Sequence, residues 1–432
     1  MALSRRTLGK RLLPHWAAVL LACIFLLGGP ARAAENLELQ PLIDEALKNS
    51  PEVLASEARA DAARFRIPQA KSLPDPMFMV GYQNEGFDRY SYGETLMSAW
   101  MFSASQLFPF PGKLGLKEDA ASRDAETFGD LHLSTRLRIA AKVKELYYDL
   151  LLAYKDLELV RAKTALFSQI EDAALARYSS GKGSQQEVLM AQAEKYMLLE
   201  KEEMFRQKIQ STEAMLNTTV GRDVNTPLGR PVEPAYRPYE ESMDRLLMSA
   251  YERSPEIKAK ERMVAASRVK VLLAKKEYYP DFTVSAEYDK KGGPFMDMWA
   301  LRTAINIPLY YKTKQRQGVF EAEALQVGAK NELEATKLLI ASGIRDNYSM
   351  VRTAEKLMDL YKNGLIPKTY QDFDSALSGY VTGKVDALTV ISRLKALLEY
   401  ETLYWGQFSE REKAIARIEA VTGGTGPGGQ MR

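Results

Sequence analysis

The chain has 432 residues, of which 46% are hydrophobic and 27% are charged, and its formal net charge at pH 7 is +3. Its only cysteine, Cys23, and one of its two histidines, His15, lie in an N-terminal segment with the features of a cleaved leader. Without that segment the chain has no cysteine and only His132. Disulfides, thiolate chemistry, a histidine-based triad and a multi-histidine metal site are then excluded. The lack of a large basic surplus argues against a nucleic-acid partner.

Residues 1–33 are predicted to be a secretory signal peptide. Four basic residues precede an apolar run from Trp16 to Leu27, and Ala31-Arg32-Ala33 has the small-residue pattern of a cleavage site. Removing five positive charges with this segment takes the net charge from +3 to −2. Ser4-Arg5-Arg6 resembles a twin-arginine start but is interpreted as an ordinary basic region of the signal, whereas lipidation of Cys23 stays open, because Leu20-Leu21-Ala22-Cys23 resembles a lipoprotein box. Cleavage at the alanines is favoured, since the apolar run continues past the cysteine.

The first half of the mature chain, residues 34–221, is predicted to hold two helices, two strands and a helical hairpin. Ser50-Pro51 separates the two helices, because proline suits the first turn of a helix, and Pro74 follows the second. The strands are predicted at about 77–84 and 96–107. From 113 to 221 no proline occurs, and apolar residues recur at steps of three and four, as in packed helices.

The hairpin at 113–221 is predicted to turn at Gly181. Its first arm, from Lys113 to Tyr178, would be roughly 100 Å long at 1.5 Å per residue. A single globular domain has no use for a rod of that length. We therefore expect this element to span a distance between two structures.

The second half repeats the plan of the first. Ser50-Pro51-Glu52 returns as Ser254-Pro255-Glu256, and Tyr178-Ser179-Ser180-Gly181-Lys182 returns as Tyr380-Val381-Thr382-Gly383-Lys384. Matches sustained over most of the chain indicate an internal duplication. We expect a linker at 222–238, a second copy at 239–423 and a disordered tail at 424–432. The second copy is predicted to have strands at about 281–289 and 298–307, and a helical hairpin at 312–423.

Alternating side chains in the predicted strands indicate a sheet with one apolar face. Residues 282–289 alternate strictly between apolar and polar. Each strand has about ten residues, the length that crosses a bilayer at a tilt, although hairpins of a soluble sandwich would alternate in the same way. Four strands are too few to close on themselves, so insertion in a membrane would require several copies that pool their strands.

Taken together, these parts resemble the TolC-type outer membrane efflux proteins over essentially the whole mature chain. Ser-Pro-Glu opens each copy, and Gln106-Leu107-Phe108-Pro109-Phe110-Pro111-Gly112-Lys113 follows the second strand. The Tyr-x-x-Gly turns are followed by Val188-Leu189 and Val390-Ile391. The Phe-Pro-Phe-Pro-Gly-Lys sequence is most similar to the heavy-metal branch of that family.

The resemblance implies a mixed α/β, mainly α fold and a homotrimer. Three chains would complete a twelve-stranded β-barrel in the cell outer membrane, and the long antiparallel hairpins would form an α-barrel in the periplasm. The function would be passive, as the exit duct of a tripartite efflux system for heavy-metal ions or drugs, with no enzyme activity and no cofactor. A periplasmic membrane-fusion adaptor, linked to an inner-membrane pump, would dock at the tip of the hairpins, on Tyr178, Gly181, Lys182, Tyr380, Gly383 and Lys384.

The resemblance also implies a gate at this tip, because relatives close it with interhelical hydrogen bonds, ion pairs and rings of carboxylates. Glu187 follows the first turn and Asp386 lies at the second, whereas Thr389 and Ser392 stand where some relatives carry aspartates. The carboxylate ring is thus reduced in this chain. The remaining carboxylates can pair with the basic residues Arg177, Lys182 and Lys384. The alternative is that these charged residues are ordinary solvated residues of the turns and have no role in a gate.

Methionines cluster around the predicted strands, and thioethers can bind soft Cu(I) or Ag(I). We interpret them instead as adaptable filling of a wall or loop, because alternation alone does not bring enough of them to one lumenal ring. The six are Met77, Met79, Met97, Met101, Met296 and Met298.

Two other functions stay open. A periplasmic coiled-coil tether or adaptor would account for the helices but not for the paired strands. An export duct for type I protein secretion would have the same architecture as a duct for small solutes.

Overall fold

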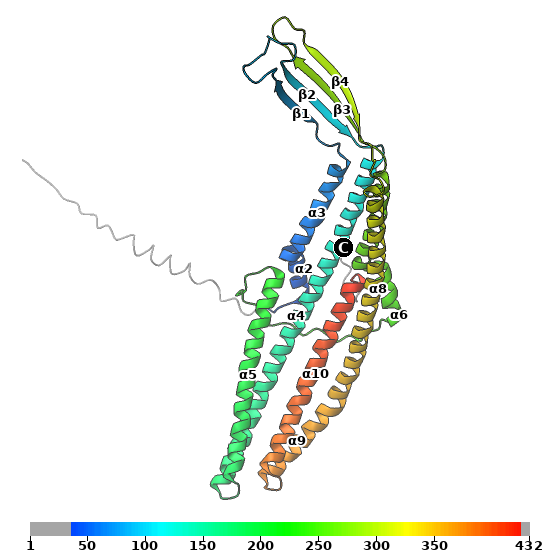
Figure 1. Cartoon of the computed structure of the whole chain (residues 1–432). Helices are drawn as coiled ribbons and strands as arrows, with labels where there is room; N and C mark the ends of the chain where they lie inside the picture. The colour runs from blue at the N-terminus through cyan, green and yellow to red at the C-terminus, as the bar shows by residue number, and fades with distance from the viewer. Residues whose placement is uncertain (1–35, 425–432) are drawn as a thin grey trace, which may run out of the picture.

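The computed structural model describes residues 36–424 (Figure 1). The predicted signal peptide at 1–33 lies outside the described residues, as does the predicted tail from 425 onward. Among residues 36–424, no helix is long and apolar enough to cross a membrane.

The first half forms two short helices, two strands and a helical hairpin. Pro51 occupies the first turn of α3, where its missing N–H has no helical partner to lose. Helix α4 runs for 67 residues without a break, because no proline interrupts it. In chain order the elements are α2 (Leu39–Asn49), α3 (Pro51–Lys71), β1 (Met77–Gln83), β2 (Ala99–Phe108), α4 (Lys113–Ser179) and α5 (Gln185–Val220).

The second half has the same order of parts but an interrupted hairpin arm. A π-helical segment ends at Leu365, two residues before Pro367, whose ring and missing N–H do not fit a regular α-helical ladder. The sequence pattern predicts a hairpin arm here without this interruption. The elements are α6 (Met243–Arg253), α7 (Pro255–Lys276), β3 (Phe282–Lys290), β4 (Met298–Ile305), α8 (Gln315–Asp359), η1 (Leu360–Leu365), α9 (Ile366–Val381) and α10 (Ala387–Thr422).

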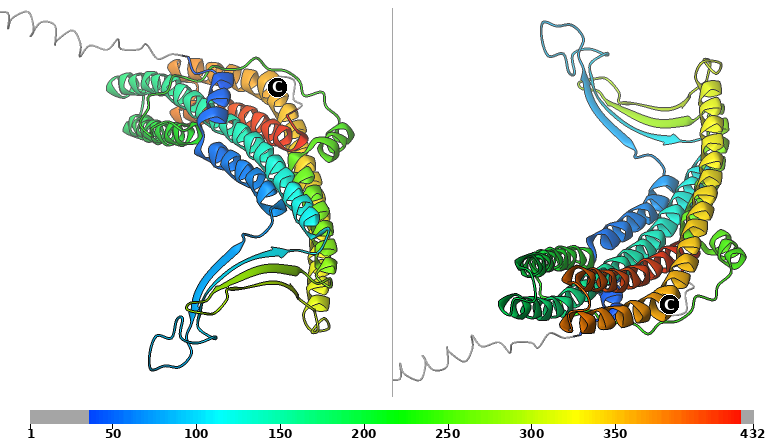
Figure 2. Two further views of the ribbon diagram at one scale, coloured as in Figure 1. Left: turned by 90° about the horizontal axis from the view of Figure 1, so that it is seen from above. Right: turned by 90° about the horizontal axis from the view of Figure 1, so that it is seen from below.

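The molecule is a long rod of helices, with a sheet at one end and the tight turns that connect α4 to α5 and α9 to α10 at the other (Figure 1). Helix α4 is the central element and packs against α3, α5, α7 and α10. Seen along the rod, the chain is curved and open on one side instead of closing into a bundle (Figure 2). This shape is that of a wall segment.

The sheet is antiparallel with the order β1-β2-β3-β4, so β2 and β3 join the two halves of the chain. Its outer strands β1 and β4 each have one edge without a strand partner among the described residues. Strand β2 starts at Ala99, later than predicted, and Ser98 before it takes part in side-chain hydrogen bonds of the loop with Ser91 and Thr95.

The hydrophobic core is drawn out along the rod in three clusters. One surrounds Tyr147 and Leu150 in the middle of α4, and a second surrounds Phe167 and Tyr380 near the turns. A third, around Ile344, joins α6, α7, α8 and α10. Each fully buried side chain of this size stabilises the fold by about 1.5–3 kcal/mol. Packing between long helices, and not one central core, therefore holds the rod together.

Candidate functional site

The two turns at the tip of the rod share one backbone geometry. Gly181 has φ 72° and Gly383 has φ 77°, in the left-handed region that favours glycine. The N–H of Gly181 donates to the carbonyl of Tyr178, and that of Gly383 donates to the carbonyl of Tyr380, both at 3.0 Å. Glycine at these positions therefore allows the chain to reverse its direction after α4 and after α9.

The helices that leave the turns begin with side-chain caps. Ser184 accepts a hydrogen bond from the N–H of Glu187, and Asp386 accepts one from the N–H of Thr389 at 2.8 Å. Hydrogen bonds from the Thr389 hydroxyl and backbone hold the pKa of Asp386 below its ordinary value. The Ser392 hydroxyl donates to the Thr389 carbonyl at 2.8 Å. In the single chain, three of the predicted gate residues thus make local contacts at the start of α10.

Glu187, the fourth predicted gate residue, takes part in a contact between the two hairpins. The Tyr380 hydroxyl donates to Glu187 Oε2 at 3.1 Å, and Arg177 Nε lies 3.9 Å from the same oxygen. Arg177 Nη1 also donates to the Tyr380 carbonyl at 2.9 Å, and the guanidinium stacks on the Tyr380 ring at 4.9 Å. We call Arg177, Glu187 and Tyr380 the tip clasp. It joins α4 and α5 of the first hairpin to α9 of the second.

Burial sets the chemistry of the tip clasp. Tyr380 has no exposed surface, and this burial, together with its hydrogen bond to Glu187, raises the pKa of Tyr380 to about 12. The phenol therefore keeps its proton near neutral pH and remains a hydrogen-bond donor. Substitution of Arg177 or Glu187 by a neutral residue would leave the other charged side chain half-buried and without its partner in the clasp.

The residues predicted to dock an adaptor do not all lie at the surface. Tyr178, Gly181, Lys182, Gly383 and Lys384 are exposed, whereas Tyr380 is enclosed by the tip clasp. The sequence indicated Arg177 as one possible partner of Glu187, but it did not indicate the contact of Tyr380 with both. A signal was present, because Phe373, Ala376 and Tyr380 recur at steps of three and four and all are buried.

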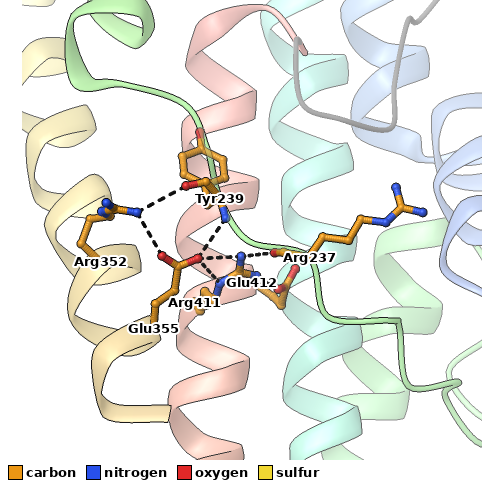
Figure 3. Close-up of polar contacts among 6 residues, drawn as sticks. All are labelled: Arg237, Tyr239, Arg352, Glu355, Arg411 and Glu412. Carbon is orange, nitrogen blue, oxygen red and sulfur yellow. Dashed lines mark hydrogen bonds and ion pairs between the residues drawn. The ribbon is translucent and has the colours of Figure 1, made fainter. Parts of the chain in front are cut away.

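A second polar cluster holds the end of the segment between the two halves against α8 and α10 (Figure 3). Arg411 of α10 is fully buried and donates to Glu355 of α8 through Nε at 3.1 Å and through Nη2 at 2.9 Å. It also contacts Glu412 and the carbonyl of Arg237. The N–H of Tyr239 donates to Glu355 at 3.0 Å. We call this set the linker clamp.

The Phe-Pro-Phe-Pro-Gly-Lys sequence forms the joint between the sheet and the rod. Lys113 is 3% exposed and its Nζ contacts Asp281 at 2.9 Å, Glu277 at 3.2 Å and the Tyr279 carbonyl at 3.1 Å. Phe110 stacks on Tyr279 with ring centroids 4.5 Å apart. The motif thus ties the first copy to the start of β3 in the second.

Two observations among the described residues concern metal ligands and the one histidine that was considered in the sequence. From 36 to 424, no group of three or more His, Cys, Asp or Glu side chains is placed to hold a metal ion. His132 Nδ1 lies 2.8 Å from Ser56 Oγ, but the Ser56 hydroxyl donates to the carbonyl of Val53 at 2.7 Å. The Val53 carbonyl therefore competes with the imidazole for the one proton of the serine hydroxyl.

The rod, the apolar-faced sheet and the paired turns define the class of TolC-like channel proteins. The fold matches the crystal structure of VceC from Vibrio cholerae with a TM-score of 0.77, covering 89% of this chain and 96% of that chain at 20% identity. It matches the crystal structure of CusC with a TM-score of 0.76, covering 89% and 92% at 14% identity. At these identities the likeness establishes the fold alone.

The chain belongs to the outer membrane efflux protein family, whose model matches residues 42–222 and 246–420. The cobalt-zinc-cadmium resistance protein CzcC of Cupriavidus metallidurans is 20% identical over 404 residues, covering 91% of this chain and 92% of that protein. The outer membrane protein TolC of Vibrio cholerae is 22% identical over 402 residues, covering 89% and 90%. The predicted TolC-like family, with its heavy-metal members, is confirmed.

Proposed function

We propose that the protein is an exit duct of a tripartite efflux system, working as a homotrimer in the outer membrane with its helices in the periplasm. The observation that supports this most is the placement of a sheet with one apolar face and two open edges at the end of a rod of helices. The predicted leader at 1–33 is consistent with export. The duct is passive, so the inner-membrane pump supplies the energy.

The open edges of the sheet support the trimer. In lipid, each unpaired backbone N–H or C=O on β1 and β4 costs several kcal/mol. Pairing β4 of one copy with β1 of the next removes both edges, and three copies give twelve strands, enough for a closed wall. The curved, open shape of the rod suits the same threefold arrangement (Figure 2).

The exposed turn residues are proposed to receive the periplasmic adaptor. Tyr178, Gly181 and Lys182 of the first turn, and Gly383 and Lys384 of the second, offer backbone and side-chain surface at the far end of the rod. Tyr380 supports this surface from within, because its ring and hydroxyl hold Arg177 and Glu187 in place.

The tip clasp is proposed to restrain the gate. Widening the end of the duct requires the second hairpin to move relative to the first, and the clasp resists that movement in each protomer. Asp386, Thr389 and Ser392 would contribute to the gate by lining the lumen of the trimer at the tip. A double variant, Arg177→Gln with Tyr380→Phe, removes the clasp without removing volume from the core.

The cargo is proposed to be heavy-metal ions, since CzcC is named a cobalt-zinc-cadmium resistance protein. Drugs are the second candidate, and the likeness to TolC-type channels favours neither of the two. A duct for type I protein secretion would have the same wall, so growth tests with metals, drugs and secreted substrates in a deletion strain separate the three.

The native mass of the protein, extracted from membranes in mild detergent, tests the assembly. Three copies per particle from an outer-membrane fraction are expected. A soluble or monomeric species would contradict the proposal and would favour the periplasmic tether.

A further inference from the structure

The register of the sheet places every methionine of the four strands on the same face. Met77 and Met79 of β1 are opposite Ser105 and Ser103, which lie four and two residues from Met101 on β2. Met101 and Met298 of β4 are both directly opposite Asp289 of β3, from its two sides. Side chains at such positions share a face. Alternation within single strands does not reveal this arrangement, and the sequence alone therefore favours the interpretation that these residues fill a wall or loop.

This face is the polar one. It carries the polar residues Ser103, Ser105, Thr283, Ser285, Glu287, Asp289 and Arg302. The opposite face is mainly aromatic and aliphatic, with Phe78, Val80, Trp100, Phe102, Phe282, Tyr288, Trp299 and Leu301. Methionines that merely filled a lipid-facing wall would lie on the apolar face. In the proposed trimer the polar face lines the lumen, and the methionines therefore line it too.

One row across this face combines two thioethers with a carboxylate. Met101 is directly opposite Asp289, and Asp289 is directly opposite Met298, so Asp289 lies between the two sulfur side chains. Directly opposed side chains have Cβ atoms about 4.5–5.5 Å apart. On the other side of Met101 the row continues to Gly81, where a Cβ would lie 3.5 Å from Met101 Cε. The methyl end of Met101 therefore lies over Gly81, and a change of rotamer would bring its sulfur toward Asp289.

The charges in this region leave the carboxylate of Asp289 available. Glu287, the acid two residues before it, is paired with Arg302 at 3.0 Å. No described residue makes an ion pair or a side-chain hydrogen bond with the Asp289 carboxylate. A negative charge without a cation thus lies between two soft donors.

The register points to Met101, Asp289 and Met298 as a binding site for a soft monovalent cation, Ag(I) or Cu(I), on the wall of the duct. Thioether sulfur prefers such ions, whereas Zn(II) and Co(II) prefer imidazole, thiolate and carboxylate ligands. The carboxylate would balance the charge of the bound ion. This inference rests on the proposed function for its lumenal position, but all three ligands come from one chain.

Silver binding to the purified, detergent-extracted protein tests the site. Isothermal titration with silver nitrate in chloride-free buffer is expected to give one saturable site per protomer. The double variant Met101→Leu with Met298→Leu keeps side-chain volume and should bind silver at least tenfold more weakly. Asp289→Asn should also weaken binding. The loop variant Met97→Leu with Met296→Leu is the matched control and should bind as the natural protein does.

Wild-type silver binding in the Met101→Leu, Met298→Leu variant would overturn the site, as would the absence of saturable binding in the natural protein. Zinc titrated in parallel is expected to give the same binding heat with the natural protein and with the double variant. Native mass measured on the same samples separates this inference from the proposed function. A trimer that binds no silver overturns only the site, whereas a monomer that binds silver overturns only the trimer.

Discussion

The two helical hairpins follow one plan, yet they differ where they meet. In the first, α4 descends without a break and Tyr178 at its turn is 47% exposed. In the second, the π segment before Pro367 interrupts the descending arm, and Tyr380 at the corresponding turn is fully buried. The first hairpin supplies the two ions of the tip clasp and the second supplies the phenol. Duplication thus produced the architecture, and divergence of a few side chains produced a contact between unlike partners.

The contact between the hairpins extends up the seam between α4 and α10. Asp149 pairs with Lys413 at 2.8 Å, and Lys163 pairs with Glu401 at 2.7 Å. Asp156 lies seven residues from each of these α4 positions and therefore on the same face of the helix. Its Oδ1 is buried without a hydrogen-bond partner among the described residues. The contact between α4 and α10 therefore has an ion pair seven residues before Asp156 and another seven residues after it, but none at Asp156 among the described residues.

The largest expected effect comes from breaking the linker clamp, which anchors the second half of the chain. Arg411→Ala leaves Glu355 and Glu412 without their buried cation, which typically costs about 3–5 kcal/mol. Thermal unfolding of the purified protein should reveal this loss. Arg393→Ala on the same helix breaks an exposed pair with Asp372 and should cost less than about 1 kcal/mol. Equal losses in the two variants would refute the clamp.

A second large effect concerns Asp156 and depends on pH. Burial raises the pKa of Asp156 from 3.8 to about 7. Between these values the folded state holds a proton that the unfolded state releases, so this group lowers stability as pH rises and its full cost is present above pH 7. Asp156→Asn should match the natural protein near pH 4 and exceed it at pH 8 by roughly 4 kcal/mol. Denaturation at both pH values measures the difference.

Asp149→Asn is the control for this prediction, because it removes one partner of a formed pair on the same face of α4. It should lower stability at pH 8, the opposite direction from Asp156→Asn. A stability difference between Asp156→Asn and the natural protein that stays constant from pH 4 to pH 8 would exclude titration of this carboxyl as the cause.

A moderate effect is expected from the two tyrosines, which compare the hairpins most simply. Tyr380→Phe removes a hydrogen bond to a carboxylate and should cost about 1.5–3 kcal/mol. Tyr178→Phe changes an exposed side chain and should leave stability unchanged. The same thermal unfolding assay measures both. Similar losses at the two positions would mean that the hairpins do not differ as described.

The smallest effect on stability, but a clear one on efflux, is expected at the turns. Valine at Gly181 or Gly383 places a β-branched residue at a positive φ, at a cost of about 1–2 kcal/mol. Gly383→Val should cost more, since its Cβ would lie 3.2 Å from Arg177 Nη1, whereas Gly181 is open. Both variants should lower efflux without lowering trimer yield, as judged by growth under the exported compound. Normal efflux in both would rule out docking at these turns.

Much of the architecture was predictable because it depends on local pattern. The absence of proline predicted the long hairpin, the turns were predicted at Gly181 and Gly383, and alternation predicted the strands. The register was not predictable, because pairing of β2 with β3 joins residues nearly two hundred positions apart. The common face of the methionines depends on that register. The π segment was not predicted, although Pro367 is a sequence signal for a break in a regular helix.

The site was predicted less completely than the fold. Residue types near a turn indicate which side chains can pair, but not which of two equivalent tyrosines is buried, since that depends on packing between hairpins. Tyr178 and Tyr380 have the same local sequence position and opposite environments. The burial of Lys113 was likewise invisible, because Glu277 and Asp281 reach it from the second copy.

The central claim is that the tip clasp, which joins the first hairpin to the second, holds the duct nearly closed. Single-channel conductance in planar bilayers tests this claim most directly. The natural protein should open small, brief channels, and the Arg177→Gln, Tyr380→Phe variant should open several-fold larger ones. Tyr178→Phe should behave as the natural protein does. Equal conductance in all three proteins would contradict the clasp, and no channels from any of them would contradict the duct itself.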